Sequence, residues 1–254
     1  MSDTNSQSQI PEHVLAAFQV EGAGKPVDVA WDGGLRFGRV VISPATPTSS
    51  WSGKAREKLA TSLDGLRFSR PVRATDGRLV VGGFVANEFA EGTPAARVDE
   101  AIAGALLYDA AASQLDPPPS DTPEDPWVAA DRSVWGHHTA EGELTVAHLD
   151  FLASCLFHGS LPPTLATLAP SGDLRPRGYT AALVIVDGLL AQAVDPGVVR
   201  RWAHIPRLPE LTRKALEFRE LAPGGSDANM RSNIERVSDL LLDERASIEV
   251  HEPR

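Results

Sequence analysis

The stretch Leu156-Phe-His-Gly-Ser-Leu-Pro-Pro-Thr-Leu-Ala-Thr-Leu-Ala-Pro170 decides how this chain is interpreted. An apolar run ends at His158-Gly159-Ser160, and a second apolar segment follows after a few residues. His158 and Ser160 do not form a catalytic pair, because residues two apart face away from each other on a helix and no G-x-S-x-G turn surrounds the serine. The stretch predicts a functional loop between two buried segments.

Length and composition describe an ordinary globular protein. The 254 residues suit one large domain or two closely joined lobes and are enough to bury a core. Apolar residues make up 42% of the chain and charged residues 23%. The 24 basic and 34 acidic residues give a net charge of −10, which disfavours binding to nucleic-acid phosphates.

Several features indicate a cytoplasmic protein without a membrane partner. Cys155 is the single cysteine, so no intrachain disulfide can form, which fits a reducing compartment. The longest apolar runs, such as Ala181–Val186, are too short to cross a bilayer. Residues 1–10 are polar, carry no targeting pattern and are expected to form a disordered tail.

Residues 11–84 have the pattern of a β-rich lobe. A short helix is expected after Pro11, and the apolar period then changes to two between Val27 and Ile42. The turn that contains Gly33 and Gly34 either folds over nucleotide phosphates or is a plain hairpin turn. A helix over Trp51–Thr61 and two strands around the Asp76-Gly77 turn complete the lobe.

Residues 93–254 have the pattern of a helical lobe, joined to the first by a hinge at residues 85–92. Helices are expected over residues 98–113, 126–135 and 144–157, over Tyr179–Val194, and over three segments after Asp195. A β-rich third followed by a helical remainder is the α+β arrangement of two lobes about one cleft.

The order of these features, with His158-Gly159 near the centre of the helical lobe, resembles the aminoglycoside phosphotransferase-like branch of the protein-kinase fold. Three phrases resemble an uncharacterised actinobacterial group within that superfamily: Arg70–Arg78, Asp131–Gly136 and Val199–Pro206. The resemblance implies a bilobal kinase-like fold.

The resemblance also implies which residues would carry phosphoryl transfer, and these positions have changed. The family's catalytic loop reads His-Gly-Asp, then an Asn, then a strand that ends in a second Asp. Here Ser160 takes the first Asp position, no Asn follows, and the second Asp position falls at Thr167. Ser43 takes the place of the strand lysine that contacts phosphates, and Glu57 is the residue that would pair with that lysine.

Nucleotide-binding features would survive only in part. The hinge residues Val85 and Asn87 would offer backbone groups to adenine, and Gly33 and Gly34 would cover phosphates. Under a shifted alignment Asp173 would be the second carboxylate, although Ser171-Gly172-Asp173 is also an ordinary turn.

The sequence therefore predicts a catalytically degenerate kinase-like protein that acts as a binding or regulatory module and needs no cofactor. The alternative is an active small-molecule phosphotransferase that uses ATP and magnesium at a rearranged site. An unknown protein or a small anionic ligand is the expected partner, and an arginine-rich helical face would meet it: Arg175, Arg177, Arg200, Arg201, Arg207 and Arg213. A metal site at His137, His138 and His148 is disfavoured, because adjacent histidines point apart.

Overall fold

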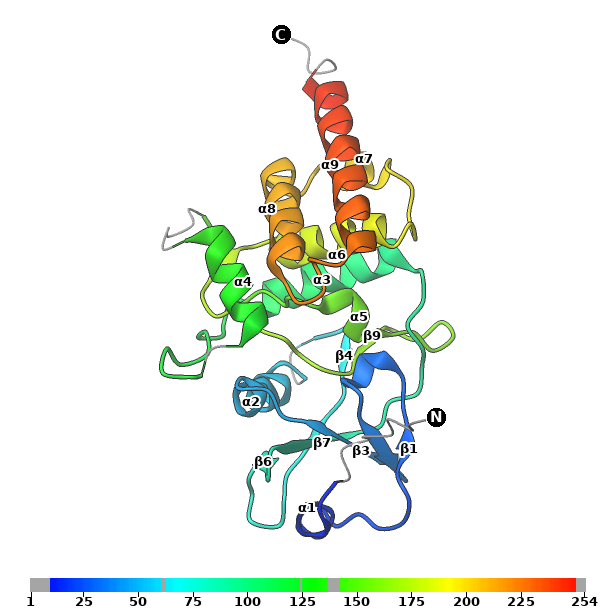
Figure 1. The fold of residues 1–254 in the computed structure, drawn as a ribbon, viewed down its shortest axis with the longest axis vertical. Helices are drawn as coiled ribbons and strands as arrows, with labels where there is room; N and C mark the ends of the chain where they lie inside the picture. The colour runs from blue at the N-terminus through cyan, green and yellow to red at the C-terminus, as the bar shows by residue number, and fades with distance from the viewer. Residues whose placement is uncertain (1–9, 61–62, 124, 137–141, 250–254) are drawn as a thin grey trace.

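The computed structural model describes residues 10–60, 63–123, 125–136 and 142–249. Figure 1 shows a sheet-rich lobe in the lower half of the view and a helical lobe above it. The fold is α+β, as predicted, and its two lobes follow one another along the chain.

The first lobe is built on a mainly antiparallel sheet. Its strand order is β1-β2-β3-β7-β5, and β6 pairs with the other end of β7. Helix α1 (Glu12–Ala17) packs against this sheet through Val14 and Phe18. The strands are β1 (Lys25–Pro26), β2 (Leu35–Phe37), β3 (Val40–Pro44), β5 (Pro71–Val72), β6 (Val80–Val81) and β7 (Phe84–Glu88).

Pairing between β3 and β7 joins the meander to the later strands in one sheet. Val40 lies opposite Glu88 and Ser43 opposite Val85 in an antiparallel register. This is the arrangement that a kinase-like first lobe requires. Residues 85–88 of the expected hinge therefore belong to β7, and the connection to the next helix begins at Phe89.

Two elements of the first lobe lie against the second. Helix α2 (Ser49–Leu59) places Ala55 and Leu59 in the core of the helical lobe. Strand β4 (Arg67–Phe68) leaves the main sheet and pairs in parallel with β10 (Thr164–Leu165), which also pairs with β9 (Cys155–Leu156). Figure 1 shows β4 and β9 between the lobes.

Helix α6 is the centre of the second lobe. Eleven of its twelve residues are buried, and α3, α5, α8 and α9 pack around it. Besides β9 and β10, this lobe contains α3 (Val98–Ala112), α4 (Pro126–Trp135), β8 (Leu144–Thr145), α5 (Phe151–Ser154), β11 (Arg175–Pro176), α6 (Tyr179–Leu190), α7 (Val198–Arg201), α8 (Leu208–Leu221) and α9 (Ala228–Glu249).

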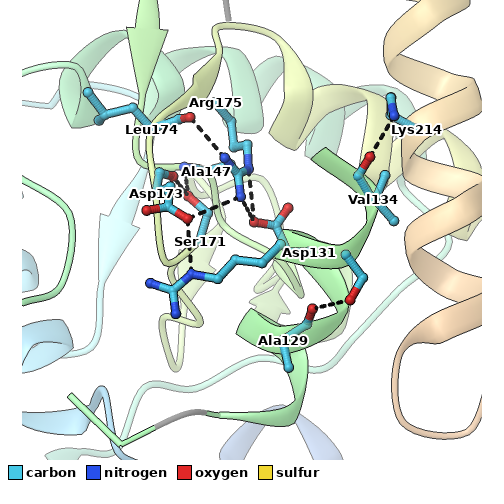
Figure 2. A network of polar contacts seen from close by, with 11 residues as sticks. Ala129, Asp131, Val134, Ala147, Ser171, Asp173, Leu174, Arg175 and Lys214 are labelled. Atoms are coloured by element: carbon cyan, nitrogen blue, oxygen red, sulfur yellow. Dashed lines mark hydrogen bonds and ion pairs between the residues drawn. The ribbon is translucent and has the colours of Figure 1, made fainter. Parts of the chain in front are cut away.

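A buried ion pair fixes α4 to the segment that precedes α6. The Arg175 guanidinium donates from Nε and Nη2 to Asp131 Oδ2, at 2.9 and 2.6 Å, and Figure 2 shows the two side chains facing each other. Asp173 lies beside them and accepts from Arg132 at 3.0 Å. The Asp125 carboxylate caps the other end of α4 by accepting from the Trp127 amide at 2.8 Å, as the Asp-Pro pair predicts.

Three local predictions were wrong. Residues 144–157 form β8, a loop, α5 and β9 instead of one helix, because Thr145 pairs with Arg175 and Cys155 with Leu165. Asp76-Gly77 makes a turn, but β5 and β6 pair with the two ends of β7 instead of with each other. In both cases strand pairing outweighed the local pattern. The first of the helices expected after Asp195 is α7, which is only four residues long.

Among the described residues, no helix is both long and apolar enough to cross a membrane.

Candidate functional site

A narrow cleft between the lobes is the candidate site. Its walls come from the turn after η1 (Val29–Trp31), from β3, from both ends of α2, from β7, from the start of α4 and from the segment between β8 and α6. Its volume is about 140 Å³. Ligand pockets for drug-sized molecules are commonly about 300–1,000 Å³. The cleft therefore has room for a small group, and a whole nucleotide would need the lobes to separate.

Carboxylates line this cleft, which corrects the expectation that nothing acidic would occupy it. Asp32 comes from the turn after η1, Asp125 from the cap of α4, and Asp150 from the residue before α5. Burial raises the pKa of Asp150 to about 6, with the Arg219 charge opposing and the Asp187 and Asp32 charges reinforcing the shift. Asp150 was not predicted as a site residue.

His148 fixes the loop that carries Asp150. Its ring is fully buried, and burial lowers the pKa of the imidazole to about 4, so the ring is neutral. Nδ1 accepts a hydrogen bond from the Asp150 amide at 3.1 Å. Nε2 therefore carries the proton and donates to the Thr167 carbonyl, 3.2 Å away. The ring links Asp150 to the segment after β10.

Two hydroxyl groups lie next to Asp150 in the cleft. Ser154 Oγ and Thr167 Oγ1 are hydrogen-bonded to each other at 3.0 Å. Thr167 also hydrogen-bonds the Asp32 carboxyl. Burial raises the pKa of Asp32, and the charge of Arg56 and this hydrogen bond offset part of the rise. Thr167 was predicted from the sequence, and the structure places it in the cleft. Ser154 was not predicted.

Ser43 anchors the glycine turn to β3. Its hydroxyl is buried and donates to the Trp31 carbonyl at 2.7 Å. A side chain at Gly34 would place Cβ 2.4 Å from Ser43 Oγ, so only glycine fits there. Gly33 has a φ of +69° and open space around it. Ser43 and Val85 both line the cleft, and they lie opposite each other in the sheet.

Arg56 is the cation of the cleft, and it comes from α2 instead of a strand. Its guanidinium donates to Asn87 Oδ1 at 2.7 Å and to the carbonyls of Ser69 and Ala166 at 2.9 and 3.2 Å. Burial lowers the pKa of Arg56 to about 10, and Asp32 and Glu57 oppose the shift, so the group stays charged at neutral pH. Asn87, expected to offer only backbone groups, holds this arginine with its side chain.

Glu57 would pair with the strand lysine that Ser43 replaces, and without that lysine it is an exposed, solvated charge. It pairs with Arg73 across a distance of 2.6 Å, and that pair is exposed. The helix therefore presents Arg56, and not Glu57, to the cleft.

His158 and Ser160 lie outside the cleft, which corrects their expected place. Because β9 and β10 pair as a hairpin, residues 157–163 connect them, and Gly159 takes a φ of +55° there. The Gly159 carbonyl accepts from Arg97 at 2.9 Å. Asp173, the alternative carboxylate, also lies away from the cleft, beside Arg132 and Arg175.

The predicted arginine face is dispersed among ion pairs. Arg175 is buried against Asp131, Arg177 pairs with Glu143, and Arg201 with Asp99 and Asp195. Arg207 pairs with Glu210 and Arg213 with Glu217. His137 and His138 lie outside the described residues. Within the described ranges, no group of three or more His, Cys, Asp or Glu side chains could hold a metal ion.

Comparison with solved structures identifies the fold. An aminoglycoside phosphotransferase from Alicyclobacillus acidocaldarius aligns over 97% of this chain and 99% of its own, with a TM-score of 0.58 and 13% identity. The chain has the fold of an aminoglycoside phosphotransferase.

Other comparisons are weaker. Two structures of a spectinomycin phosphotransferase, one with ADP and spectinomycin and one with AMP, align with TM-scores of 0.39 and 0.42 at 9% and 11% identity. They cover 87% and 95% of this chain and 88% and 94% of their own. No family model and no curated protein matches the chain. The phosphotransferase fold is therefore established by structure, with no relative close enough in sequence to assign an activity.

Proposed function

We propose that this chain is a catalytically degenerate member of the kinase-like fold, a pseudokinase that acts as a binding or regulatory module. The observation that carries the proposal is the hydrogen bond between Ser154 and Thr167. We read His148-Leu149-Asp150 as the counterpart of the family's His-Gly-Asp, with the metal-binding Asn and Asp that follow it replaced by these two hydroxyl residues.

Magnesium does not fit this pair. Mg²⁺ in phosphotransferase sites is bound through carboxylates and substrate phosphates in near-octahedral geometry. The Ser154 and Thr167 hydroxyls are neutral and hydrogen-bond each other, and Thr167 also hydrogen-bonds the Asp32 carboxyl, so neither position supplies the carboxylate that the metal needs.

A nucleotide phosphate also lacks its usual partner. Ser43 supplies no charge from β3, and Arg56 already donates to Asn87 and to two backbone carbonyls. The cleft carries Asp32, Asp125 and Asp150 against this one arginine, so its charge disfavours a phosphate chain. We therefore place a small anionic ligand elsewhere on the molecule and regard a protein as the other candidate partner. Cys155 is free and buried, which fits the cytoplasm as the site of action.

One observation favours the alternative of an active phosphotransferase with a rearranged ATP and magnesium site. Asp150 lies in the cleft, and its raised pKa of about 6 suits a general base. In that case the lobes would have to open to admit the nucleotide, and Asp32 would have to supply the missing carboxylate.

Thermal unfolding with ATP, with MgCl₂ and with both separates the two. For the wild type we expect no midpoint rise that depends on magnesium, since a ligand stabilises only the state that binds it. The double variant Ser154→Asn, Thr167→Asp restores the family's metal-binding groups. It should be less stable than the wild type without metal, because a new carboxylate then lies beside Asp32 and Asp150, and it should recover on adding Mg²⁺.

A magnesium-dependent rise of several degrees in the wild type, lost in Asp150→Asn together with phosphoryl transfer, would overturn the degenerate assignment in favour of the active enzyme.

A further inference from the structure

A second cavity lies at the C-terminal half of α2 and shares Arg56 with the cleft. It is formed by this half of the helix, by Ala60 and Leu63, and by residues 66–71, which include the strand β4 and the start of β5. Its volume is about 600 Å³, several times that of the cleft. Part of its wall is apolar, from Leu63, Leu66, Phe68 and Pro71. This cavity is large enough for a small organic molecule.

The polar wall of this cavity is basic, although the whole chain has a net charge of −10. Arg56, Arg67 and Arg70 line it against the single carboxylate of Glu57. Glu57 is itself bound by Arg73 through two hydrogen bonds. Arg73, which does not line the cavity, thus neutralises the Glu57 carboxylate, and the positive charges of Arg56, Arg67 and Arg70 are not offset by it.

Arg67 and Arg70 differ from most arginines of this protein. Both are exposed, and within the described part of the chain neither side chain has a hydrogen bond or an ion pair. By contrast Arg97, Arg177, Arg201 and Arg213 each contact a carboxylate. Two guanidinium groups that no carboxylate hydrogen-bonds therefore line one cavity, and the charge of Arg70 acts on Glu57 only at longer range.

The backbone under these two arginines is fixed on both sides. The Arg67 and Ser69 amides donate to the carbonyls of Pro163 and Leu165, each at 2.9 Å. The Arg70 carbonyl accepts from the Glu88 amide at 2.8 Å. Arg56, only 5% exposed, closes the inner end and donates to the Ser69 carbonyl. A ligand would meet a wall that is already formed, which lowers the entropic cost of binding.

We propose that this cavity binds a small organic anion, a phosphate or carboxylate group on an apolar body. The anionic group would lie between Arg67 and Arg70, since a guanidinium presents paired donors that match phosphate and carboxylate oxygens. The apolar body would contact Leu63 and Pro71, the partly exposed apolar residues of the wall. The site shares Arg56 with the cleft but needs none of the cleft's other residues, so it stands whether or not the chain transfers phosphoryl groups.

Isothermal titration with phenyl phosphate at low ionic strength tests the proposal. We expect saturable binding in the wild type, with a Kd on the order of 0.1–1 mM. Arg67→Gln and Arg70→Gln should each weaken binding about tenfold or more, because each removes charge-assisted hydrogen bonds. Arg39→Gln is the matched control: Arg39 is exposed and lies outside the cavity, so its loss should leave the Kd unchanged.

Three further probes define the ligand. Inorganic phosphate should bind more weakly than phenyl phosphate if the apolar wall contributes, and benzyl alcohol should not bind. Tighter binding of phenyl phosphate than of benzoate assigns a phosphate ligand, and the reverse assigns a carboxylate.

Equal affinity in the wild type and both arginine variants would overturn the site. So would a loss in Arg39→Gln as large as theirs, or no binding at millimolar phenyl phosphate. Because Arg67 and Arg70 are exposed, the variants should unfold within about 0.5 kcal/mol of the wild type, so a failure to bind cannot be assigned to misfolding.

Discussion

Asp150 is the single residue whose chemistry depends most on its surroundings. Its side chain is 31% exposed and lies near the charges of Asp32 and Asp187, with Arg219 as the compensating charge, and partial burial raises its pKa to about 6 from 3.8. A carboxyl with a raised pKa in the folded state stabilises the fold fully below the unfolded value near pH 4, and this contribution is lost as the pH rises through 6.

We expect Asp150→Asn to gain stability relative to the wild type between pH 5 and pH 8. The amide cannot ionise, so the variant avoids the full cost of a charged group in the cleft at pH 8 and only part of it at pH 5, where the unfolded carboxyl is ionised but the folded one is still mostly protonated. Urea midpoints at the two pH values measure the difference. Asp116→Asn, at an exposed position, is the control and should shift the midpoint equally at both. A gain that is the same at pH 5 and pH 8 would contradict this account of Asp150.

Arg175 and Asp131 make the opposite case, a buried pair in which each charge needs the other. The two side chains are 3% and 0% exposed, both hydrogen bonds go to Asp131 Oδ2, and Asp131 Oδ1 accepts none within the described part of the chain. Figure 2 shows how Arg175 also approaches Asp173 and the Leu174 carbonyl. Arg175 therefore holds α4 against the β8–β11 ladder.

Replacing Arg175 by Met should cost about 3–5 kcal/mol, because it leaves the Asp131 carboxylate buried and unpaired. Arg213→Met breaks an exposed pair with Glu217 one helical turn away, and should cost less than about 1 kcal/mol. Chemical denaturation of both variants provides the comparison. Similar losses in the two would show that Asp131 is solvated or protonated once its partner is removed.

At the scale of elements, the orientation of α2 determines that a positive charge, that of Arg56, faces the cleft. Four of its side chains donate to carbonyls of the second lobe: Trp51 to Asp116, Ser52 to Leu168, Arg56 to Ala166 and Lys58 to Gln114. This docking fixes the rotation of the helix, so that Arg56 faces inward and Glu57 outward. The helix therefore places the guanidinium of Arg56 in the cleft, while the neighbouring carboxylate of Glu57 faces solvent.

Arg56→Met should destabilise the protein by about 2–4 kcal/mol, because it leaves Asn87 Oδ1 and two buried carbonyls without their donor. Glu57→Gln, on the adjacent exposed position, should change stability by less than about 1 kcal/mol. The measurement is the free energy of unfolding in urea for each variant. If both substitutions cost the same, Arg56 does not anchor α2 to the sheet and β10.

At the scale of the whole molecule, the core of the helical lobe is completed by residues of the first lobe. Ala55, Leu59, Leu66 and Phe68 belong to the first lobe by sequence, yet they pack in the cluster that surrounds α6. Strand β4 pairs with β10, and a smaller cluster joins Trp31 and Val41 to Leu156. The boundary near residue 85 therefore separates the two lobes along the chain, but side chains from both lobes pack together across it.

We expect one cooperative unfolding transition for the whole molecule, because two of its hydrophobic clusters contain residues of both lobes. Hydrogen exchange at low urea should give the amides of β3 and β7 the same unfolding free energy as those of α6. Exchange of the sheet amides at a clearly lower free energy would instead mean that the first lobe opens alone.

The sequence alone determined the class of fold and much of the helical lobe. The apolar stripe of α3, the Asp-Pro cap of α4 and the continuous apolar run of α6 are local signals, and local periodicity is enough to predict them. The positions of Ser43 and Thr167 in the cleft were also predicted, because each lies at or just beyond the end of a strand that the resemblance located.

Only the tertiary structure decided which residues face the cleft. Two segments of the chain have a histidine two residues before an oxygen-bearing side chain, His148-Leu-Asp150 and His158-Gly-Ser160, and no local pattern predicts which of them is buried. Because β9 pairs with β10, His158 lies in the connection between these strands, whereas His148 is buried. In the same way, the docking of α2 on the second lobe chose Arg56 over Glu57. Both choices depend on contacts between residues far apart in the chain, where burial and hydrogen bonding override the local pattern.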